Sequence, residues 1–223
     1  MDEIRLIEVQ EGIFSENEQL ADKLRSELKS RGVLLLNLMS SPGAGKTTLL
    51  LETIRVLRGK LQIGVLEADI DAIVDAEKVA AAGVPAIQLR TGGFCHLDAA
   101  MVSQGLGALP LDKLDLVIIE NVGNLVCPAE FDTGAHKNVM ILSVPEGDDK
   151  PLKYPLMFSI CDVILISKID TTSCFDFDFE LVKKRIHKLN PEAEIFEVSA
   201  KTGAGVAAWI EWLQSVVSCS LMG

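Results

Sequence analysis

The sequence predicts an α/β protein with one doubly wound, mostly parallel sheet, helices on both faces of the sheet and an additional N-terminal helix. Short apolar runs recur along the chain, and amphipathic segments of helical length lie between them. A glycine-rich turn follows the first of these runs and opens a helix, which is the context that phosphate groups need. Together these three observations predict a doubly wound, phosphate-binding fold.

The first predicted element is a helix that precedes the sheet. Ser15 with Glu18 three residues later resembles a capping box, and Leu20, Leu24 and Leu28 follow at helical spacing. We therefore expect an N-terminal helix that begins near Ser15 and packs on the sheet.

Six short apolar runs predict buried parallel strands: Val33 to Met39, Ile63 to Leu66, Leu116 to Ile119, Val139 to Val144, Val163 to Ile166 and Ile195 to Val198. Five amphipathic segments predict the helices that connect or follow them: Thr47 to Leu57, Ala72 to Ala82, Leu97 to Leu106, Phe179 to Lys188 and Val206 to Val217. Residues 170–178 have little apolar periodicity and predict a surface loop.

Length and composition favour one domain. The chain has 223 residues, of which 48% are hydrophobic, and it contains no internal repeat or long linker. We expect a single P-loop GTPase domain over residues 1–223, with residues 1–31 as an N-terminal helical extension and residues 32–223 as the G domain.

Charge and apolar patterning exclude two classes of partner. A formal net charge of -11 argues against nucleic acid, which needs clustered lysine and arginine. No apolar run approaches the roughly 20 residues that span a bilayer, and the acidic start MDEIR lacks a basic leader. We expect a cytoplasmic protein that contacts no membrane and whose five widely spaced cysteines are reduced.

The segment from Leu34 to Leu50, LLLNLMSSPGAGKTTLL, predicts a phosphate-binding loop. In such a loop backbone N–H groups surround a polyphosphate, Lys46 reaches the β and γ phosphates as a catalytic cation, and the Thr47 hydroxyl binds Mg²⁺. The helix that begins near Thr47 adds the positive end of its dipole. The predicted nucleotide-binding residues here are Ser41, Pro42, Gly43, Ala44, Gly45, Lys46, Thr47 and Thr48.

A strict G-x-x-x-x-G-K-[ST] motif would have glycine at position 40, where this chain has Ser40. Gly43, Gly45 and Lys46 still supply the close approach and the cation. A glycine-rich turn that binds nothing is the alternative interpretation, and the strand before the turn and the helix after it favour the phosphate loop. The sequence therefore predicts the P-loop NTPase fold.

Two later loops predict that the base is guanine. Ser167-Lys168-Ile169-Asp170 follows a strand and resembles the N-K-x-D motif, in which the carboxylate accepts from N1–H and the exocyclic amine of guanine. Taken alone, this sequence is more typical of a turn or helix cap. The next strand runs into Ser199-Ala200-Lys201, which resembles the fifth GTPase motif. Ser167 replaces the usual asparagine and removes an amide that ties this loop to the phosphate loop, so we expect a change in nucleotide affinity rather than in base choice.

Hydrolysis requires acidic groups near the γ phosphate and Mg²⁺. We expect Asp69 and Glu120 near Mg²⁺, directly or through waters, and Asp75 as the group that positions the attacking water or switches with nucleotide state. Each of the three acids has a helix cap or a solvated surface as its alternative role. No arginine is a candidate for the transition-state finger, so slow intrinsic turnover is expected.

Cys95, His96 and Cys127 lie in two glycine-flanked loops and provide two thiols and an imidazole, which are good ligands for Ni²⁺ and Zn²⁺. The alternatives are that the cysteines are small buried hydrophobes and that His96 caps the helix near Leu97. Three ligands leave a tetrahedral site incomplete, which predicts an exchangeable metal. Because Cys95 and His96 are adjacent, their side chains point different ways unless the loop bends, and a site that bridges two subunits would solve this.

Across nearly the whole chain the motifs resemble the HypB family, the nickel-incorporation GTPases of [NiFe]-hydrogenase maturation. The matching segments run from ADK at residues 21–23 through SSPGAGKTT, DAEKV, TGGFCHLDA, DLVIIENVGNLVCPAEFD, EGDDKPLKYP and SKID to SAKTG. The resemblance implies a parallel-sheet P-loop fold and a GTPase that hydrolyses the β–γ phosphoanhydride, with GTP, Mg²⁺ and Ni²⁺ or Zn²⁺ as ligands.

The resemblance also implies that nickel is bound through Cys95, His96 and Cys127 and that GTP induces a homodimer. The implied partners are a small zinc-containing nickel metallochaperone and, indirectly, the hydrogenase large subunit. The family's clustered N-terminal cysteines and histidine-rich tract are absent from this sequence, so nickel storage is not predicted.

Three other functions remain open from the sequence. A urease-type nickel GTPase would carry Cys-Pro-His at its metal loop, whereas here Cys-His and Cys-Pro occur in separate places. A metal sensor or storage module with inert GTPase machinery would be consistent with Ser40 and Ser167. A signalling or targeting GTPase would have its cysteines merely buried.

Overall fold

The computed structural model describes residues 9–69 and 74–221. Within these residues seven strands form one sheet in the order β3-β2-β4-β1-β5-β6-β7, and every neighbouring pair is parallel. The strands are β1 (Leu34–Ser40), β2 (Ile63–Asp69), β3 (Ala86–Arg90), β4 (Leu116–Glu120), β5 (Lys137–Ser143), β6 (Val163–Ser167) and β7 (Glu194–Glu197). All carboxyl ends therefore meet at one edge of the sheet, where the loops that follow them can share a site.

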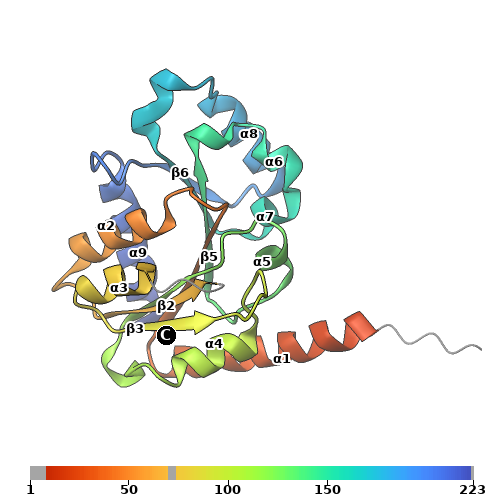
Figure 1. Ribbon diagram of the computed structural model, residues 1–223, viewed down its shortest axis with the longest axis vertical. Helices are drawn as coiled ribbons and strands as arrows, with labels where there is room; N and C mark the ends of the chain where they lie inside the picture. The colour runs from red at the N-terminus through yellow and green to blue at the C-terminus, as the bar shows by residue number, and fades with distance from the viewer. Residues whose placement is uncertain (1–8, 70–73, 222–223) are drawn as a thin grey trace, which may run out of the picture.

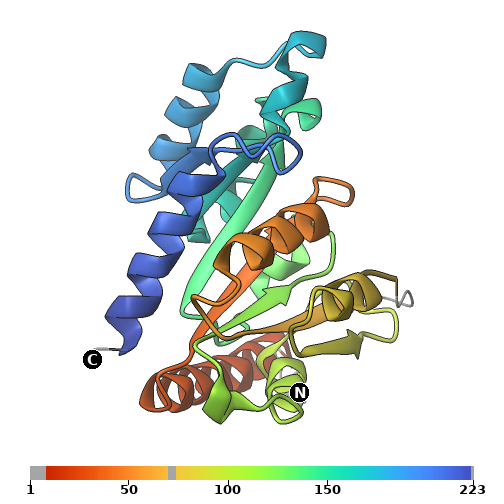
Figure 2. The same cartoon turned by 90° about the vertical axis from the view of Figure 1, so that its left-hand side faces the viewer.

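Helices cover both faces of this sheet (Figures 1 and 2). They are α1 (Val9–Ser30), α2 (Lys46–Leu57), α3 (Val74–Ala81), α4 (Ala99–Leu106), α5 (Cys127–Glu130), α6 (Lys150–Lys153), α7 (Pro155–Ile160), α8 (Phe179–Leu189) and α9 (Val206–Leu221). Short 3₁₀ segments are η1 (Leu111–Lys113), η2 (Val144–Glu146) and η3 (Ile169–Cys174). The predicted doubly wound α/β class is confirmed.

The core lies on both faces of β1, because its side chains alternate between them. Leu34, Leu36 and Leu38 pack in the cluster beneath α2 and α9, whereas Leu35 and Met39 belong to two clusters on the opposite face. One of these opposite clusters lies under α1 and α4, and the other lies under α7 and α8. A sheet buried on both faces explains why its strands read as nearly continuous apolar runs.

The six predicted strands are present, although β7, predicted to be buried, lies at an edge of the sheet and is only partly buried. The strand that sequence periodicity missed is β3. Its sequence AIQLR carries Gln88 and Arg90 and forms an edge of the sheet that pairs only with β2. An edge strand buries less of its surface, so it does not need a continuous apolar run. Of the predicted helix Ala72–Ala82, residues 72 and 73 lie outside the described residues.

The predicted N-terminal helix is present, but its predicted start is wrong. Helix α1 begins at Val9, so Ser15 and Glu18 lie inside it and form no capping box. The helix is held by burial of Leu24 and Leu28, as the spacing predicted, whereas the predicted Leu20 is only partly buried and Ala21 is buried in addition. Figure 1 shows α1 beside α4.

The predicted surface loop at residues 170–178 is partly ordered as a 3₁₀ segment. Segment η3 covers residues 169–174, and Phe177 then turns inward, with its ring centroid 5.0 Å from that of Phe179. Among the described residues, no helix is both long and apolar enough to cross a bilayer. The division into an N-terminal extension and a G domain stays a prediction.

The His136 side chain joins α1 to the sheet, and its lowered pKa predicts that the folded protein loses stability in acid. Its Nδ1 accepts the Leu35 N–H at 3.0 Å, and its Nε2 lies 3.1 Å from the Arg25 carbonyl, so the neutral imidazole fits. Burial lowers the pKa of His136 below the ordinary 6.5. Below about pH 6.5 the unfolded chain therefore takes up a proton that the folded protein does not, and stability is lost as the pH falls.

We expect the free energy of unfolding to fall from pH 7 to pH 5, and His136→Gln to flatten part of this slope. Urea unfolding of both proteins across this range measures the difference, which isolates His136 from other groups. Parallel pH curves for the two proteins would contradict the assignment.

Candidate nucleotide and metal sites

The loop between β1 and α2 borders a cavity of about 360 Å³ at the carboxyl edge of the sheet. Gly43 and Gly45 have φ angles of +74° and +103°, which side chains rarely adopt, so the loop needs glycine at both positions. The cavity is lined by Gly43, Gly45, Lys46, Thr47, Thr48, Glu67, Ala68, Lys78, Glu120, Asn121 and Gly123. A polar cavity at the start of α2 suits a polyphosphate.

Ser40 occupies the position where the strict motif has glycine, and it contacts the loop lysine. Its buried hydroxyl accepts from Lys46 Nζ at 3.0 Å and donates to the Ser41 carbonyl at 2.6 Å. The ammonium group is therefore directed toward the loop by a neutral partner. The serine is accommodated without loss of the glycine conformations at positions 43 and 45.

Thr47 and Glu120, two predicted magnesium ligands, lie in contact. The Thr47 hydroxyl donates to Glu120 Oε1 at 2.7 Å, and Glu120 is only 3% exposed. A hydroxyl and a carboxylate beside a phosphate cavity are the oxygen ligands that Mg²⁺ uses. Asp69 ends β2 and Asp75 lies in α3, but their side chains lie outside what the structure describes, so their roles stay predictions.

Two lining residues were missed by the sequence motifs. Glu67 is 3% exposed and stands directly opposite Glu120 in the register of β2 and β4. Lys78 of α3 adds a second ammonium group to the cavity. The signal for Glu67 was available, because a carboxylate within an otherwise buried apolar strand needs a functional or ionic partner.

The two predicted base-reading loops line one second cavity of about 270 Å³. The Ser199 hydroxyl donates to Asp170 Oδ1 at 2.6 Å and orients this carboxylate. Lys168 adopts a left-handed φ of 58°, and its Nζ donates to the Gly43 carbonyl at 2.7 Å. The lining residues are Ala44, Gly45, Thr48, Leu49, Ser167, Lys168, Asp170, Thr171, Ala200 and Lys201.

The expectation that Ser167 loses the tie to the phosphate loop is wrong. Its hydroxyl donates to the Ala44 carbonyl at 3.0 Å, and Ser167 is only 5% exposed. A serine hydroxyl is shorter than an asparagine amide, but the two loops approach closely enough for it to reach. The base loop is therefore joined to the phosphate loop at two points, Ser167 and Lys168.

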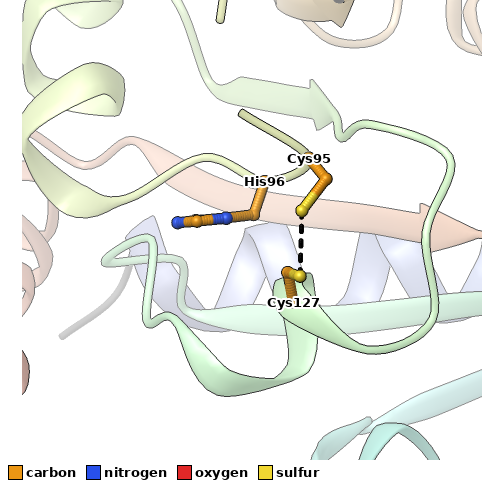
Figure 3. Close-up of side chains that lie close together, drawn as sticks. All are labelled: Cys95, His96 and Cys127. Atoms are coloured by element: carbon orange, nitrogen blue, oxygen red, sulfur yellow. Dashed lines mark hydrogen bonds between the residues drawn. The ribbon is translucent and has the colours of Figure 1, made fainter. Parts of the chain in front are cut away.

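Cys95, His96 and Cys127 come together within one chain. Each residue offers one ligand atom, and these atoms all lie within 4.8 Å of one another. The two thiols face each other with 2.9 Å between the sulfur atoms, and the His96 ring extends away from them, with one ring nitrogen nearer to the thiols than the other (Figure 3). Sulfur ligands of a tetrahedral ion stand about 3.8 Å apart, given metal–sulfur bonds of about 2.3 Å, so a small opening would admit a metal.

The concern that adjacent Cys95 and His96 diverge is resolved by the bend of their loop. Gly92 and Gly93 have φ angles of +63° and +102° and turn the chain just before the ligands. A second subunit is therefore not needed to bring these three ligands together. The fourth coordination position is left to water or to another molecule.

His96 is held as a ligand would be. Its ring stacks on Phe131 with centroids 3.9 Å apart, and Nδ1 is buried without a hydrogen-bond partner among the described residues. Asp98 caps α4 by accepting from the Met101 N–H, so His96 is not the cap. Burial lowers the pKa of His96, which keeps the imidazole neutral and able to bind a metal.

The pKa of the Cys127 thiol is raised, chiefly by its hydrogen bond with Cys95. Thiols must lose protons to become strong ligands, so metal binding at this pair releases protons and tightens as pH rises.

The segment from Glu120 to Cys127 joins the two sites. Asn121 and Gly123 line the phosphate cavity, and a Cβ added to Gly123 would lie 3.0 Å from the Pro42 Cα. Farther along, the Asn124 amide lies 3.4 Å from the Cys95 carbonyl. The same short segment therefore touches the phosphate loop and both metal loops.

Comparison with known proteins first identifies the protein family to which the chain belongs. Residues 34–197 match the family described as CobW/HypB/UreG, nucleotide-binding domain, so the chain belongs to this family.

More closely, the chain is 45% identical over 215 residues to the hydrogenase maturation factor HypB of Escherichia coli K12, covering 96% of this chain and 74% of that protein. A structure of HypB from Helicobacter pylori in complex with nickel matches with a TM-score of 0.87 and 40% identity, covering 91% of this chain and 95% of that one. HypB from Archaeoglobus fulgidus matches with a TM-score of 0.85 and 38% identity, covering 91% and 99%. The predicted membership among the HypB hydrogenase maturation GTPases is confirmed, as is the P-loop fold.

Proposed function

We propose that this protein is a GTP-hydrolysing metallochaperone that binds nickel and assists its insertion into [NiFe]-hydrogenase. The observation that carries the proposal is the segment from Glu120 to Cys127, which begins at the phosphate cavity and ends at the metal ligands. Membership in the HypB family supports the hydrogenase as the target.

The nucleotide chemistry follows from the cavity. Lys46 and the loop N–H groups hold the β and γ phosphates, while Thr47, Glu120 and Asp69 hold Mg²⁺ directly or through waters. Water attacks the γ phosphorus, the bond to the β–γ bridging oxygen breaks, and GDP and phosphate leave. Asp75 positions this water. No arginine lines the described part of the cavity, which supports slow intrinsic turnover.

Nickel is the cargo of the second site. Cys95, His96 and Cys127 supply soft and borderline ligands that suit Ni²⁺ and Zn²⁺ alike. The nickel complex of the Helicobacter pylori relative supports nickel as the physiological ion. A site with three ligands and an open position releases its metal more readily than a closed four-ligand site, as a delivery protein requires.

GTP and nickel are coupled through the shared segment. Pro42 of the phosphate loop packs against Gly123, which also lines the phosphate cavity, so a bound γ phosphate displaces the segment that carries Cys127 and changes the geometry of the ligands. Such a coupling is reciprocal, so nickel changes GTP affinity by the same factor. Hydrolysis then returns the segment and alters metal and partner affinity.

The partners in this proposal are a second copy of the chain, joined in the presence of GTP, and a small zinc-containing nickel metallochaperone. Phe94 and Val126 support a docking surface here, because they flank the ligands and are 57% and 50% exposed. The hydrogenase large subunit receives the metal indirectly. The cytoplasmic location and the absence of nucleic-acid and membrane partners stay predictions.

A metal sensor or storage module with inert GTPase machinery is the second candidate function, and it is less well supported than the sequence alone suggested. Ser40 and Ser167 suggested defective nucleotide binding, yet both hydroxyls bond to the phosphate loop. A urease-type GTPase is disfavoured because the ligands are Cys-His in one loop and a single cysteine in the other. Multiple-turnover GTP hydrolysis separates the enzyme from the sensor.

Asp170→Asn tests the guanine assignment. Asparagine cannot accept from both N1–H and the amine of guanine, so preference for GTP should fall about 100-fold, consistent with the loss of charge-assisted hydrogen bonds. Xanthosine triphosphate, with a carbonyl in place of the amine, should become the better substrate. Hydrolysis assays with GTP, ATP and xanthosine triphosphate measure this. Unchanged GTP preference in the variant would remove Asp170 from the base site.

A further inference from the structure

A buried chain of amide side chains runs beneath the segment that joins the two sites. The Val122 N–H donates to Asn121 Oδ1 at 2.8 Å, Asn121 Nδ2 donates to Asn37 Oδ1 at 3.0 Å, and Asn37 Nδ2 donates to Asn138 Oδ1 at 3.1 Å. The chain runs from the residue that follows β4 across β1 to β5. A backbone N–H can only donate, so the Val122 contact fixes the orientation of every amide in the chain.

The position of Asn37 is unusual for its strand. It is 2% exposed, and its neighbours in β1, Leu36 and Leu38, are also buried. A leucine at this position would itself need no hydrogen bond, so burial alone does not explain why the side chain is an amide. Its contribution is a directed contact to Asn121, which is 1% exposed.

The segment that passes over Asn37 packs into an apolar cluster on each side of this residue. Val122 belongs to the apolar cluster beneath α1 and α4, whereas Leu125 belongs to the cluster beneath α7 and α8. On the same face of β1, Leu35 and Met39 belong to these two clusters respectively, so Asn37 lies between them. The apolar contacts hold the segment to the core, and the amide contact sets its register at the first residue after Glu120.

We propose that Asn37 is a positioning residue for the nickel site, acting through Asn121 to set the segment that carries Cys127. This inference rests on the proposed function for the identity of the cargo as nickel. The geometry of the hydrogen-bonded amide chain is independent of that function. A buried hydrogen bond with no alternative partner specifies one arrangement where apolar contacts alone allow several. Without it the segment samples positions in which Cys127 is away from Cys95 and His96, and apparent nickel affinity falls by the fraction that remains competent.

The test compares Asn37→Leu and Asn37→Ala with the control Asn190→Ala. Asn190 also uses its side-chain amide for hydrogen bonds, since Nδ2 donates to the Ser159 and Cys161 carbonyls and Oδ1 accepts the Glu192 N–H, and it touches neither the segment nor the ligands. Asn37→Ala introduces no extra bulk, so it keeps the test open if the leucine variant fails to fold. Thermal melting selects conditions of equal stability for all four proteins.

The first readout is amide hydrogen exchange of residues 121–127 in metal-free, nucleotide-free protein. Both Asn37 variants should exchange at least tenfold faster there, while peptides from α8 and α9 keep wild-type rates. The second readout is nickel titration, in which the dissociation constant should rise at least tenfold. Asn190→Ala should leave both readouts within twofold of wild type.

Exchange in residues 121–127 within twofold of wild type in both Asn37 variants would overturn the positioning role. Faster exchange throughout the protein would do so as well, because it would show a general loss of stability. If the wild type itself binds no nickel, the proposed function fails, and the exchange readout still decides the role of Asn37.

Discussion

Replacing Cys95 with alanine should weaken nickel binding by at least about 100-fold, or about 3 kcal/mol. The thiol belongs to one of three candidate ligands whose donor atoms lie within 4.8 Å, and its sulfur is 2.9 Å from that of Cys127. Its removal leaves two protein ligands and a cavity that only water fills. Calorimetric titration of nucleotide-free protein with Ni²⁺ measures the change.

Cys219→Ala is the matched control, because Cys219 is an exposed free thiol on α9 outside the cluster. It should bind nickel as the wild type does. GTP hydrolysis without nickel should persist in Cys95→Ala, since Cys95 does not line the phosphate cavity. Nickel affinity that survives in Cys95→Ala would show that Cys95 is not a nickel ligand and that the metal binds elsewhere.

Lys46→Ala should abolish GTP turnover, with a loss on the order of 10²–10³-fold or more in rate. The ammonium group stands at the mouth of the loop, 3.0 Å from Ser40 Oγ, and is the loop's own cation for the β and γ phosphates. Charge that develops on those phosphates during hydrolysis would lose the positive group that the loop itself supplies. Release of inorganic phosphate over many turnovers measures the rate.

Nickel binding is the internal control for this experiment, because Lys46→Ala should lose GTP turnover alone. Nucleotide-free Lys46→Ala should keep the nickel affinity of the wild type within about twofold, because Lys46 contacts none of the three metal ligands. Lys188→Ala, at an exposed position on α8, should hydrolyse GTP at the normal rate. A Lys46→Ala protein that turned over GTP normally would show that the phosphate loop is misassigned.

The sequence predicted the sheet and the ligand set because both depend on local patterns. Buried parallel strands require largely apolar runs, and the five inner strands carry them, whereas the edge strand β7 (EIFE) has only a short one. The phosphate loop needs glycine at positions 43 and 45 whatever surrounds it, so its pattern is visible without the fold. The edge strand β3 was not predicted, because Gln88 and Arg90 interrupt its apolar run.

What the sequence could not supply were the distances between loops. Ser167 was expected to lose a tie that its hydroxyl makes to the Ala44 carbonyl, because loop separation is set by packing far along the chain. Cys95 and His96 were expected to point different ways unless their loop bends, and Gly92 and Gly93 do bend it. Ser15 resembled a cap because its local pattern fits one, but burial of later leucines extends the helix past it.

The central claim is that nucleotide and metal influence each other through one short segment. Titration of Ni²⁺ with and without a non-hydrolysable GTP analogue, and of the analogue with and without Ni²⁺, tests it most directly. We predict that each ligand changes the affinity of the other, and by the same factor. Affinities that stay equal in every state would contradict the claim and leave two independent sites on one chain.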